Sequence, residues 1–301
     1  MRGKYEGSLL GIFIADALAA TGIGLSKEEI KSKYGSLRDL IGGGKLNLDP
    51  GECTDEGQMT ASVLESICTL RSFKPDNIAQ RFVGWLKSRP RDIDDFTRHV
   101  LERQSEGETW QEASEAASYD KSLDTAGSIA IIYSIPVALL RIHRPKKLLE
   151  DVSTACRITH WDERCVQGAL VACYAVTRLA LGEPDVYGKS LAFAAEHAPI
   201  YKEPLAAVPQ MRYDDLQPSG YSIATVQSAF WFLLNSDSFE NAVCRAAALG
   251  GKRPDAIAAL TGAFFGAAYG RSGIPERWIY QVVGRDRIEV LASRLYELSI
   301  A

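Results

Sequence analysis

The chain has 301 residues, of which 46% are hydrophobic and 24% are charged, and its formal net charge is -4. This composition is typical of an ordinary soluble globular protein. The basic residues are scattered along the chain, which argues against a nucleic-acid-binding surface. Because the six cysteines include no CxxC pair, we expect reduced core thiols in a cytoplasmic protein and no disulfide framework.

The first apolar segment predicts a buried helix and neither a signal peptide nor a membrane span. Residues 6–20 are small and apolar, with Gly7, Gly11 and Ala15 at a four-residue spacing that lets another helix approach closely. Asp16 interrupts this run, which argues against a leader and against membrane insertion. A carboxylate in so apolar a helix must be paired, capped or functional. We interpret Asp16 as structurally paired, with ligation of a metal as the alternative.

Helical periodicity continues along the rest of the chain. Helices are expected at 57–72, 76–88, 94–106, 109–118, 127–142, 146–158, 163–181, 187–197, 222–235, 239–248, 255–270, near 275–278 and at 285–298. Residues 21–50 are rich in glycine and predict an irregular surface segment. No pair of segments alternates as a β-hairpin does, and no 34- or 40-residue repeat is present. The sequence therefore predicts a single compact all-α domain over residues 1–301.

The first polar cluster lies between a Pro50-Gly51 turn and an apolar helix, and consists of Thr54, Asp55 and Glu56. One interpretation is helix capping, since Thr54 or Asp55 can accept hydrogen bonds from the free N–H groups of the first turn. The alternative is an all-oxygen site of the kind that Mg²⁺ or Mn²⁺ prefers. Two acidic residues cannot complete a metal site alone, so the second interpretation requires ligands from elsewhere in the chain.

Three further polar clusters interrupt the apolar helices. They are Asp92-Ile93-Asp94-Asp95, Thr159-His160-Trp161-Asp162 and Gly250-Gly251-Lys252-Arg253-Pro254-Asp255. Each lies where one helix ends and the next begins, so capping of the helix ends is one interpretation of all three. The alternative is that these acids and His160 contact a ligand, and that backbone N–H groups of the paired glycines meet an anion.

Taken in order, these clusters resemble the motifs of the ADP-ribosylglycohydrolase family over nearly the whole chain. Residues 7–18 are similar to the family's opening helix, 54–59 to its T-D-D-T-Q-M turn, 92–94 to D-I-G, 159–162 to T-H-x-D, 219–221 to G-G-Y, 250–263 to G-G-D-x-D-T-x-A-A-I-x-G-A and 274–278 to I-P-x-x-W. No single motif is strong, but seven in the right order are specific for the fold.

The resemblance implies a compact orthogonal helical bundle in which one or two Mg²⁺ or Mn²⁺ ions assist hydrolysis of the bond between ADP-ribose and an acceptor. The implied metal ligands are Thr54, Asp55, Glu56 and Asp255. The implied catalytic carboxylates are Asp55, Glu56 and Asp92, one of which would take a proton from the attacking water. The residues that would bind the substrate are Gly127, Ser128, His160, Gly220, Tyr221, Gly250 and Gly251.

The sequence departs from the family pattern at several of these positions. Glu56 replaces an aspartate, and of the D-x-D-T motif only Asp255 remains, preceded by Lys252-Arg253-Pro254. Ile23 falls where the family often has a glutamate, and residues 127–133 stand where it shows G-N-G-x-x-M-R. A lysine or arginine near the site competes with a metal for the same carboxylates. We therefore expect the fold to be kept and the metal site to be weakened, with one ion or none.

Three functions follow from these observations. The first is a hydrolase that removes ADP-ribose from a modified protein or from a small-molecule conjugate. The second is a hydrolase of another ribosyl or nucleotide glycoside, which the altered segment at 127–133 suggests. The third is a non-catalytic protein that binds ADP-ribose or has a structural role, which Lys252-Arg253-Pro254 suggests.

Overall fold

The computed structural model describes all 301 residues and confirms the predicted all-α class. Its α-helices are α1 (Arg2–Ala20), α2 (Lys27–Tyr34), α3 (Asp55–Leu70), α4 (Pro75–Lys87), α5 (Asp95–Ser105), α6 (Trp110–Ser118), α7 (Ile129–Tyr133), α8 (Ile135–Leu140), α9 (Pro145–Arg157), α10 (Glu163–Ala180), α11 (Val186–His197), α12 (Lys202–Ala207), α13 (Ser222–Asn235), α14 (Phe239–Ala247), α15 (Pro254–Tyr269), α16 (Glu276–Gln281) and α17 (Arg285–Ile300). Four 3₁₀ turns are η1 (Pro199–Tyr201), η2 (Val208–Gln210), η3 (Tyr213–Asp215) and η4 (Arg271–Gly273). The only β-type pairings are two isolated bridges.

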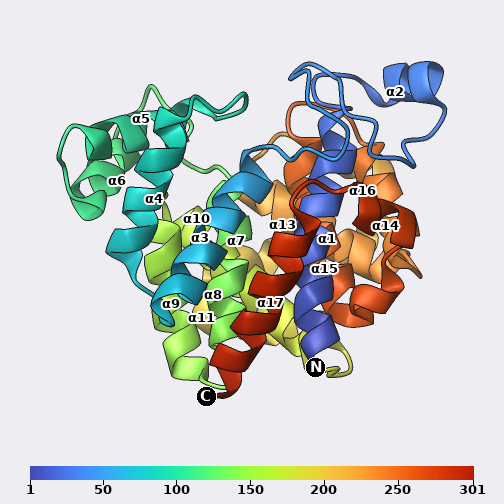
Figure 1. Ribbon diagram of the computed structural model, residues 1–301. Coiled ribbons are helices and arrows are strands. Elements are labelled where there is room, and N and C mark those ends of the chain that lie inside the picture. Colours follow the sequence, from blue (N-terminus) through green and yellow to red (C-terminus); the bar gives the residue numbers. More distant parts are fainter.

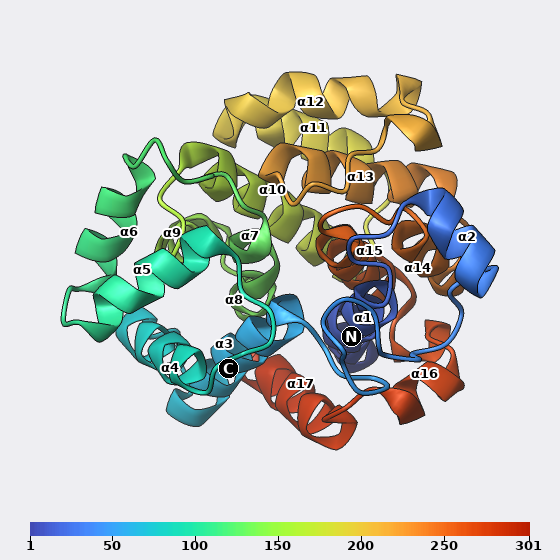
Figure 2. The same cartoon turned by 90° about the horizontal axis from the view of Figure 1, so that it is seen from above.

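Helix α1 runs through the middle of the molecule, with α15 beside it and α3, α14 and α17 around it (Figures 1 and 2). The pair α1 and α15 forms the most extensive helix contact of the fold. The small residues that the sequence spaces four apart lie at this crossing, where the backbones of Gly11 and Gly262, and of Gly7 and Gly266, touch. A Cβ atom on any of these glycines would overlap the facing backbone. The glycine spacing therefore sets the closest approach in the core.

Three segments differ from the sequence prediction, and the first is the short helix α12, where no helix was expected. Residues 27–34, expected to be irregular, form helix α2, because Ser26 and Glu29 make a reciprocal capping box at its start. The helix expected at 127–142 is divided at Ser134 into α7 and α8. Pro136 has no N–H group to donate within a continuous helix, and it occupies the first turn of α8, where none is needed.

One hydrophobic core of 85 buried residues connects helices from both halves of the chain. A separate small cluster of Phe96, Val100, Ala113 and Ala117 joins α5 to α6 at one side of the molecule (Figure 1). All six cysteines are unpaired, as predicted, and five of them are buried. None of the helices has the length and apolar content that crossing a membrane requires.

Candidate active site

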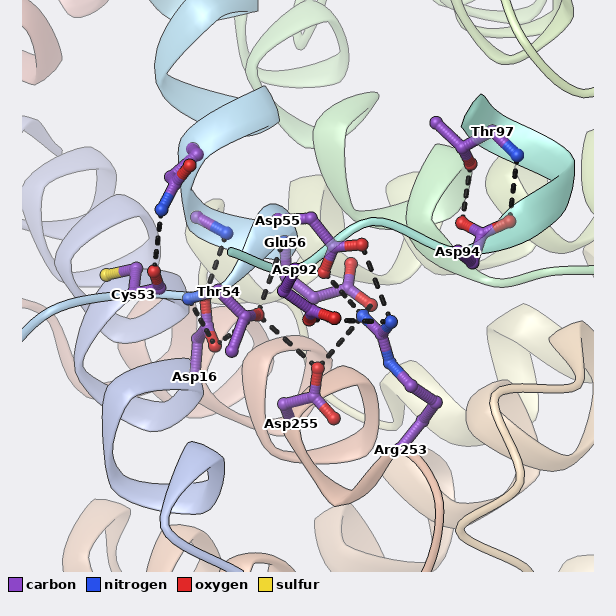
Figure 3. A network of polar contacts seen from close by, with 12 residues as sticks. Asp16, Cys53, Thr54, Asp55, Glu56, Asp92, Asp94, Thr97, Arg253 and Asp255 are labelled. Carbon is purple, nitrogen blue, oxygen red and sulfur yellow. Dashed lines mark hydrogen bonds and ion pairs between the residues drawn. The ribbon is translucent and has the colours of Figure 1, made fainter. Parts of the chain in front are cut away.

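The turn before helix α3 is held by Asp16 of helix α1 (Figure 3). Asp16 is fully buried, and its carboxylate accepts hydrogen bonds from the Thr54 N–H at 3.1 Å, the Thr54 hydroxyl at 2.7 Å and the Gly57 N–H at 2.9 Å. The structure therefore agrees with the interpretation of Asp16 as a paired carboxylate. Burial and the nearby Asp255 raise the pKa of Asp16 well above its usual value, against the effect of these hydrogen bonds.

Replacing Asp16 with alanine is expected to lower the free energy of unfolding by about 3 kcal/mol, because three buried donors lose their acceptor. Urea unfolding followed by circular dichroism measures this change. Asp94→Ala is the matched control, since Asp94 also accepts from the N–H and the hydroxyl of one threonine, Thr97, but at a partly exposed helix start. Its loss should cost about 1 kcal/mol. Equal costs for the two variants would contradict the role assigned to Asp16.

Four carboxylates from three parts of the chain converge beside this turn. Asp55 and Glu56 begin helix α3, Asp92 lies in the segment before α5, and Asp255 lies in the first turn of α15 (Figure 3). Asp55, Asp92 and Asp255 each offer an oxygen atom within 4.8 Å of the other two. The predicted meeting of the chain near residue 55 with the chain near residue 255 is therefore present, and the segment at residue 92 joins it.

The capping interpretations also hold for some of the predicted residues. Thr54 is the N-cap of α3 and accepts from the Glu56 N–H at 3.4 Å, while its hydroxyl lies 3.3 Å from Asp255 Oδ2. In the second cluster, Asp94 caps α5 and leaves Asp92 to join the carboxylates. Asp162 caps α10 through the Arg164 N–H. Capping and the candidate site thus use neighbouring residues of the same turns.

The guanidinium of Arg253 lies among the four carboxylates (Figure 3). Its Nη2 is 2.5 Å from Asp55 Oδ1, 3.0 Å from Asp255 Oδ2 and 3.3 Å from Glu56 Oε1, and its Nη1 is 3.5 Å from Asp92 Oδ2. The Arg253 side chain is 13% exposed. Burial lowers the pKa of Arg253, but the four acids raise it by more, to well above its usual value. Arg253 is therefore a fixed positive charge.

The carboxylates retain protons more strongly than ordinary acids. Burial raises the pKa of Asp55 to about 7, a shift that Arg253 reduces and Asp92 increases. Burial, together with Asp55, raises the pKa of Glu56 well above its usual value. Burial also raises the pKa values of Asp92 and Asp255. Since Glu56 Oε2 and Asp255 Oδ1 have no hydrogen-bond partner, the cluster keeps buried acceptor atoms free for a ligand or a proton.

The three aspartates are chemically suitable ligands for a divalent cation, because Mg²⁺ and Mn²⁺ prefer carboxylate oxygens. The arrangement does not fit one, because Arg253 already pairs with the three aspartates that would hold it. An acidic triad capable of holding a metal is therefore present, but a resident guanidinium occupies it.

Two of the glycines predicted to bind substrate lie next to Arg253. Gly220 has a φ of +84° and packs against the Arg253 stem, where an added Cβ would lie 2.8 Å from Arg253 Cγ. The Gly251 N–H was predicted to donate a hydrogen bond to an anion. It donates instead to the Leu25 carbonyl, at 2.7 Å. The Arg253 N–H donates to the Pro218 carbonyl at 2.9 Å. The first bond ties the residues before α15 to the segment after α1, and the second ties them to the 217–221 loop.

A strip beside this loop contains four of the other predicted substrate residues, namely Gly127, Ser128, His160 and Tyr221. Tyr221 and Gly127 make an isolated β-bridge. His160 is fully buried beneath it: its Nδ1 is 2.8 Å from the Thr159 hydroxyl, and its Nε2 faces Gly127 and has no hydrogen-bond partner. Burial lowers the pKa of His160, against the effect of Asp94, Asp162 and Asp124, and so favours the neutral ring. Ser128 is also buried, and Gly250 packs near the Leu25 carbonyl. Contact of these residues with a substrate stays a prediction.

The sequence analysis did not single out Arg164. Its guanidinium pairs with Asp162 at 2.5 Å, contacts the Thr125 hydroxyl at 3.2 Å and lies 5.8 Å from the centre of the Tyr221 ring. It is therefore a partly exposed cation beside the strip. Its position in the first turn of α10 carries no sequence signal, since a single arginine near a helix start has many uses.

Comparison with known proteins agrees with this geometry. A sequence model of the ADP-ribosylglycohydrolase family matches residues 1–301. The chain belongs to the ADP-ribosylglycohydrolase family. An ADP-ribosylarginine hydrolase of Pseudomonas putida (strain GB-1) is 30% identical over 306 residues, which cover 98% of this chain and 78% of the relative. The match to this family was predicted from the order of the motifs, and it is confirmed.

Two further members of the family are similar over most of their length. The ADP-ribosyl-[dinitrogen reductase] glycohydrolase of Rhodospirillum rubrum is 30% identical over 275 residues, covering 91% of this chain and 88% of the relative. A solved structure described as an ADP-ribosylglycohydrolase-related protein complex superposes with a TM-score of 0.82 at 27% identity, covering 99% of this chain and 98% of that one. The family's helical fold is therefore shared along the whole chain.

Proposed function

We propose that this protein hydrolyses the glycosidic bond between ADP-ribose and a modified acceptor, with Asp55, Glu56 and Asp92 as its catalytic carboxylates. The observation that carries the proposal is the convergence of these acids at one buried point, with the pKa of Asp55 raised to about 7. A general base works best when its pKa lies near the operating pH. The names of the relatives from Pseudomonas putida and Rhodospirillum rubrum support ADP-ribose as the group removed.

In the proposed reaction, a carboxylate of the cluster takes a proton from water as the water oxygen bonds to the anomeric carbon of the ribose. The glycosidic bond breaks, its electron pair stays with the acceptor atom, and this atom takes up the proton that the carboxylate removed from water or one from solvent. Positive charge develops on the ribose ring as the acceptor departs, and the remaining carboxylates stabilise it. Asp92, whose side chain is 17% exposed, is the member of the cluster placed to meet the substrate from solvent.

Mg²⁺ or Mn²⁺ would be held here by Thr54, Asp55, Glu56 and Asp255 if the guanidinium of Arg253 were not already paired with three of these residues. When bound, such an ion would polarise a ribose hydroxyl or a water molecule. Arg253 opposes this binding, since it pairs with Asp55, Glu56 and Asp255. The proposed hydrolysis therefore relies on the carboxylates of the chain and includes no step that needs a metal.

The proposed substrate is an ADP-ribosylated protein or a small-molecule conjugate of ADP-ribose, and Gly127, Ser128, His160, Gly220, Tyr221, Gly250 and Gly251 are its proposed binding residues. The single large core supports the proposal that residues 1–301 act as one domain. The six unpaired cysteines support a reducing, cytoplasmic location.

The test is the release of free ADP-ribose, measured by liquid chromatography and mass spectrometry. We expect release from a protein mono-ADP-ribosylated on arginine at a rate at least ~100-fold above the rate without enzyme. A peptide ADP-ribosylated on serine and a simple ribonucleoside serve as the competing substrates. Release of base from the nucleoside alone would favour the hydrolase of another glycoside. Binding of ADP-ribose with no turnover of any substrate would favour a non-catalytic protein.

A further inference from the structure

We propose that Arg253 is the resident cation of this site, and that it takes the place of a divalent metal ion among Asp55, Asp92 and Asp255. The protein then acts on its substrate without a tightly bound Mg²⁺ or Mn²⁺ at these residues. This inference deepens the proposed function, because it names the positive charge beside which the carboxylates work. Its main test reads metal binding, so it can fail or hold independently of the hydrolysis assay.

The first step of the argument is that the guanidinium and a metal ion would need the same oxygen atoms. The three aspartates whose oxygens lie within 4.8 Å of one another are the ones that pair with Arg253, at 2.5 Å for Asp55, 3.0 Å for Asp255 and 3.5 Å for Asp92. The guanidinium also contacts both oxygens of Asp55, at 2.5 Å and 3.4 Å. A planar fork of donors matches a carboxylate in this way. A divalent cation placed among these carboxylates would be repelled by the positive charge of Arg253.

The second step is that the fold holds Arg253 in this position. Its backbone N–H donates to the Pro218 carbonyl, Gly220 closes against its stem, and Pro254 begins helix α15 directly after it. The helical conformation is disfavoured for a residue before a proline, and Arg253 has a non-helical backbone with φ −140° and ψ 62°. The neighbouring Lys252 is exposed and forms no ion pair. Of the two adjacent cations, only Arg253 is therefore built into the cluster.

The third step concerns what Arg253 does there. Asp55, Glu56 and Asp255 are at most 1% exposed, so without a nearby cation their negative charges would repel one another in a water-poor environment. Arg253 offsets part of this charge and fixes the orientation of Asp55 through two hydrogen bonds. It is a positioning residue in this sense, and it leaves Glu56 Oε2 and Asp255 Oδ1 without partners.

The test compares Mn²⁺ binding by the wild type with that of Arg253→Ala and Arg253→Asp, using the loss of the free Mn²⁺ signal in electron paramagnetic resonance. Wild-type protein should bind Mn²⁺ at this site no more tightly than millimolar. Both variants should gain one site per chain with an affinity at least tenfold higher, and Arg253→Asp should bind more tightly because it adds a ligand. Lys252→Ala is the matched control, since it removes one neighbouring positive charge and should leave Mn²⁺ binding unchanged.

Thermal unfolding gives a second readout. The wild-type midpoint should change by less than ~1 °C between EDTA and 1 mM Mn²⁺, whereas the midpoint of Arg253→Ala should be lowered in EDTA and should rise by several degrees in Mn²⁺. If Arg253→Ala does not fold, Arg253→Gln, which keeps the size without the charge, must meet the same criteria. Tight binding of one Mn²⁺ per chain by the wild type, or no gain of binding in any Arg253 variant, would overturn the proposal.

Discussion

Asp55→Asn is expected to lower the rate of ADP-ribose release by about 10³-fold while the protein stays folded, within the range of 10²–10⁴ for loss of a general acid or base. The amide has nearly the same shape as the carboxylate but cannot take a proton from water. It also removes the negative charge that pairs with Arg253 at 2.5 Å. The measurement is the initial rate on arginine-linked ADP-ribose at saturating substrate, with circular dichroism to verify the helical content.

Glu52→Gln is the control for this prediction. Glu52 lies three residues before Asp55 in sequence, but it is partly exposed and pairs with Arg91 on the surface, at 3.0 Å. Its substitution removes one negative charge from the same turn without touching the cluster, and the rate should stay within about twofold of the wild type. A similar loss in both variants would show that the general charge of the turn, and not Asp55 itself, supports the reaction.

Gly262→Ala is expected to destabilise the protein by about 3 kcal/mol or more, which is at the upper end of the cost of overpacking a core. The added Cβ would overlap the backbone of Gly11 and also lie 2.7 Å from the Ala15 Cβ. Neither neighbour is the end of a flexible side chain, so α1 and α15 would have to separate. Differential scanning calorimetry or urea unfolding measures the loss.

The matched control is Gly84→Ala in helix α4, where an added Cβ meets nothing within 4 Å. Alanine favours a helix over glycine by about 0.5–1 kcal/mol, so this variant should be slightly more stable than the wild type. Opposite signs for the same substitution in two helices would show that close approach, and not helix propensity, determines the cost at Gly262. If Gly262→Ala were neutral, the crossing would have to be looser than the structure shows.

Much of the fold could be predicted because most helices have an apolar face with a clear period. The exceptions have local causes. Helix α2 is polar and short, and its capping box at Ser26 and Glu29 is a sequence signal that the glycine content of the segment outweighed. The break between α7 and α8 is not visible in the hydrophobic pattern, because both halves are buried and mostly apolar, and Pro136 is the sequence signal that the prediction of one helix passed over. Periodicity predicts a helix of this kind but does not show where it is interrupted.

The candidate site could be predicted in part. The sequence indicates that acids near residues 55 and 255 belong to one site, because their motifs resemble those of one family. In the structure these acids lie side by side. It also indicates a cation that competes with a metal. It does not show that Arg253 enters the cluster while Lys252 faces solvent, since that depends on backbone direction at Pro254 and on the space beside Gly220. The direction of a side chain at such a position is set by tertiary packing.

The three segments that supply the carboxylates are separated by long stretches of chain, from residues 55–56 through 92 to 255. A proteolytic fragment that lacks residues 55–56, residue 92 or residue 255 contains only part of the site, because α3, the segment before α5 and α15 each supply one part of it. Measurable activity therefore indicates that all three segments are folded in place in the same molecule. During refolding, activity should therefore recover only after α15 has packed against α1, because this packing brings Asp255 to Thr54 and Asp55.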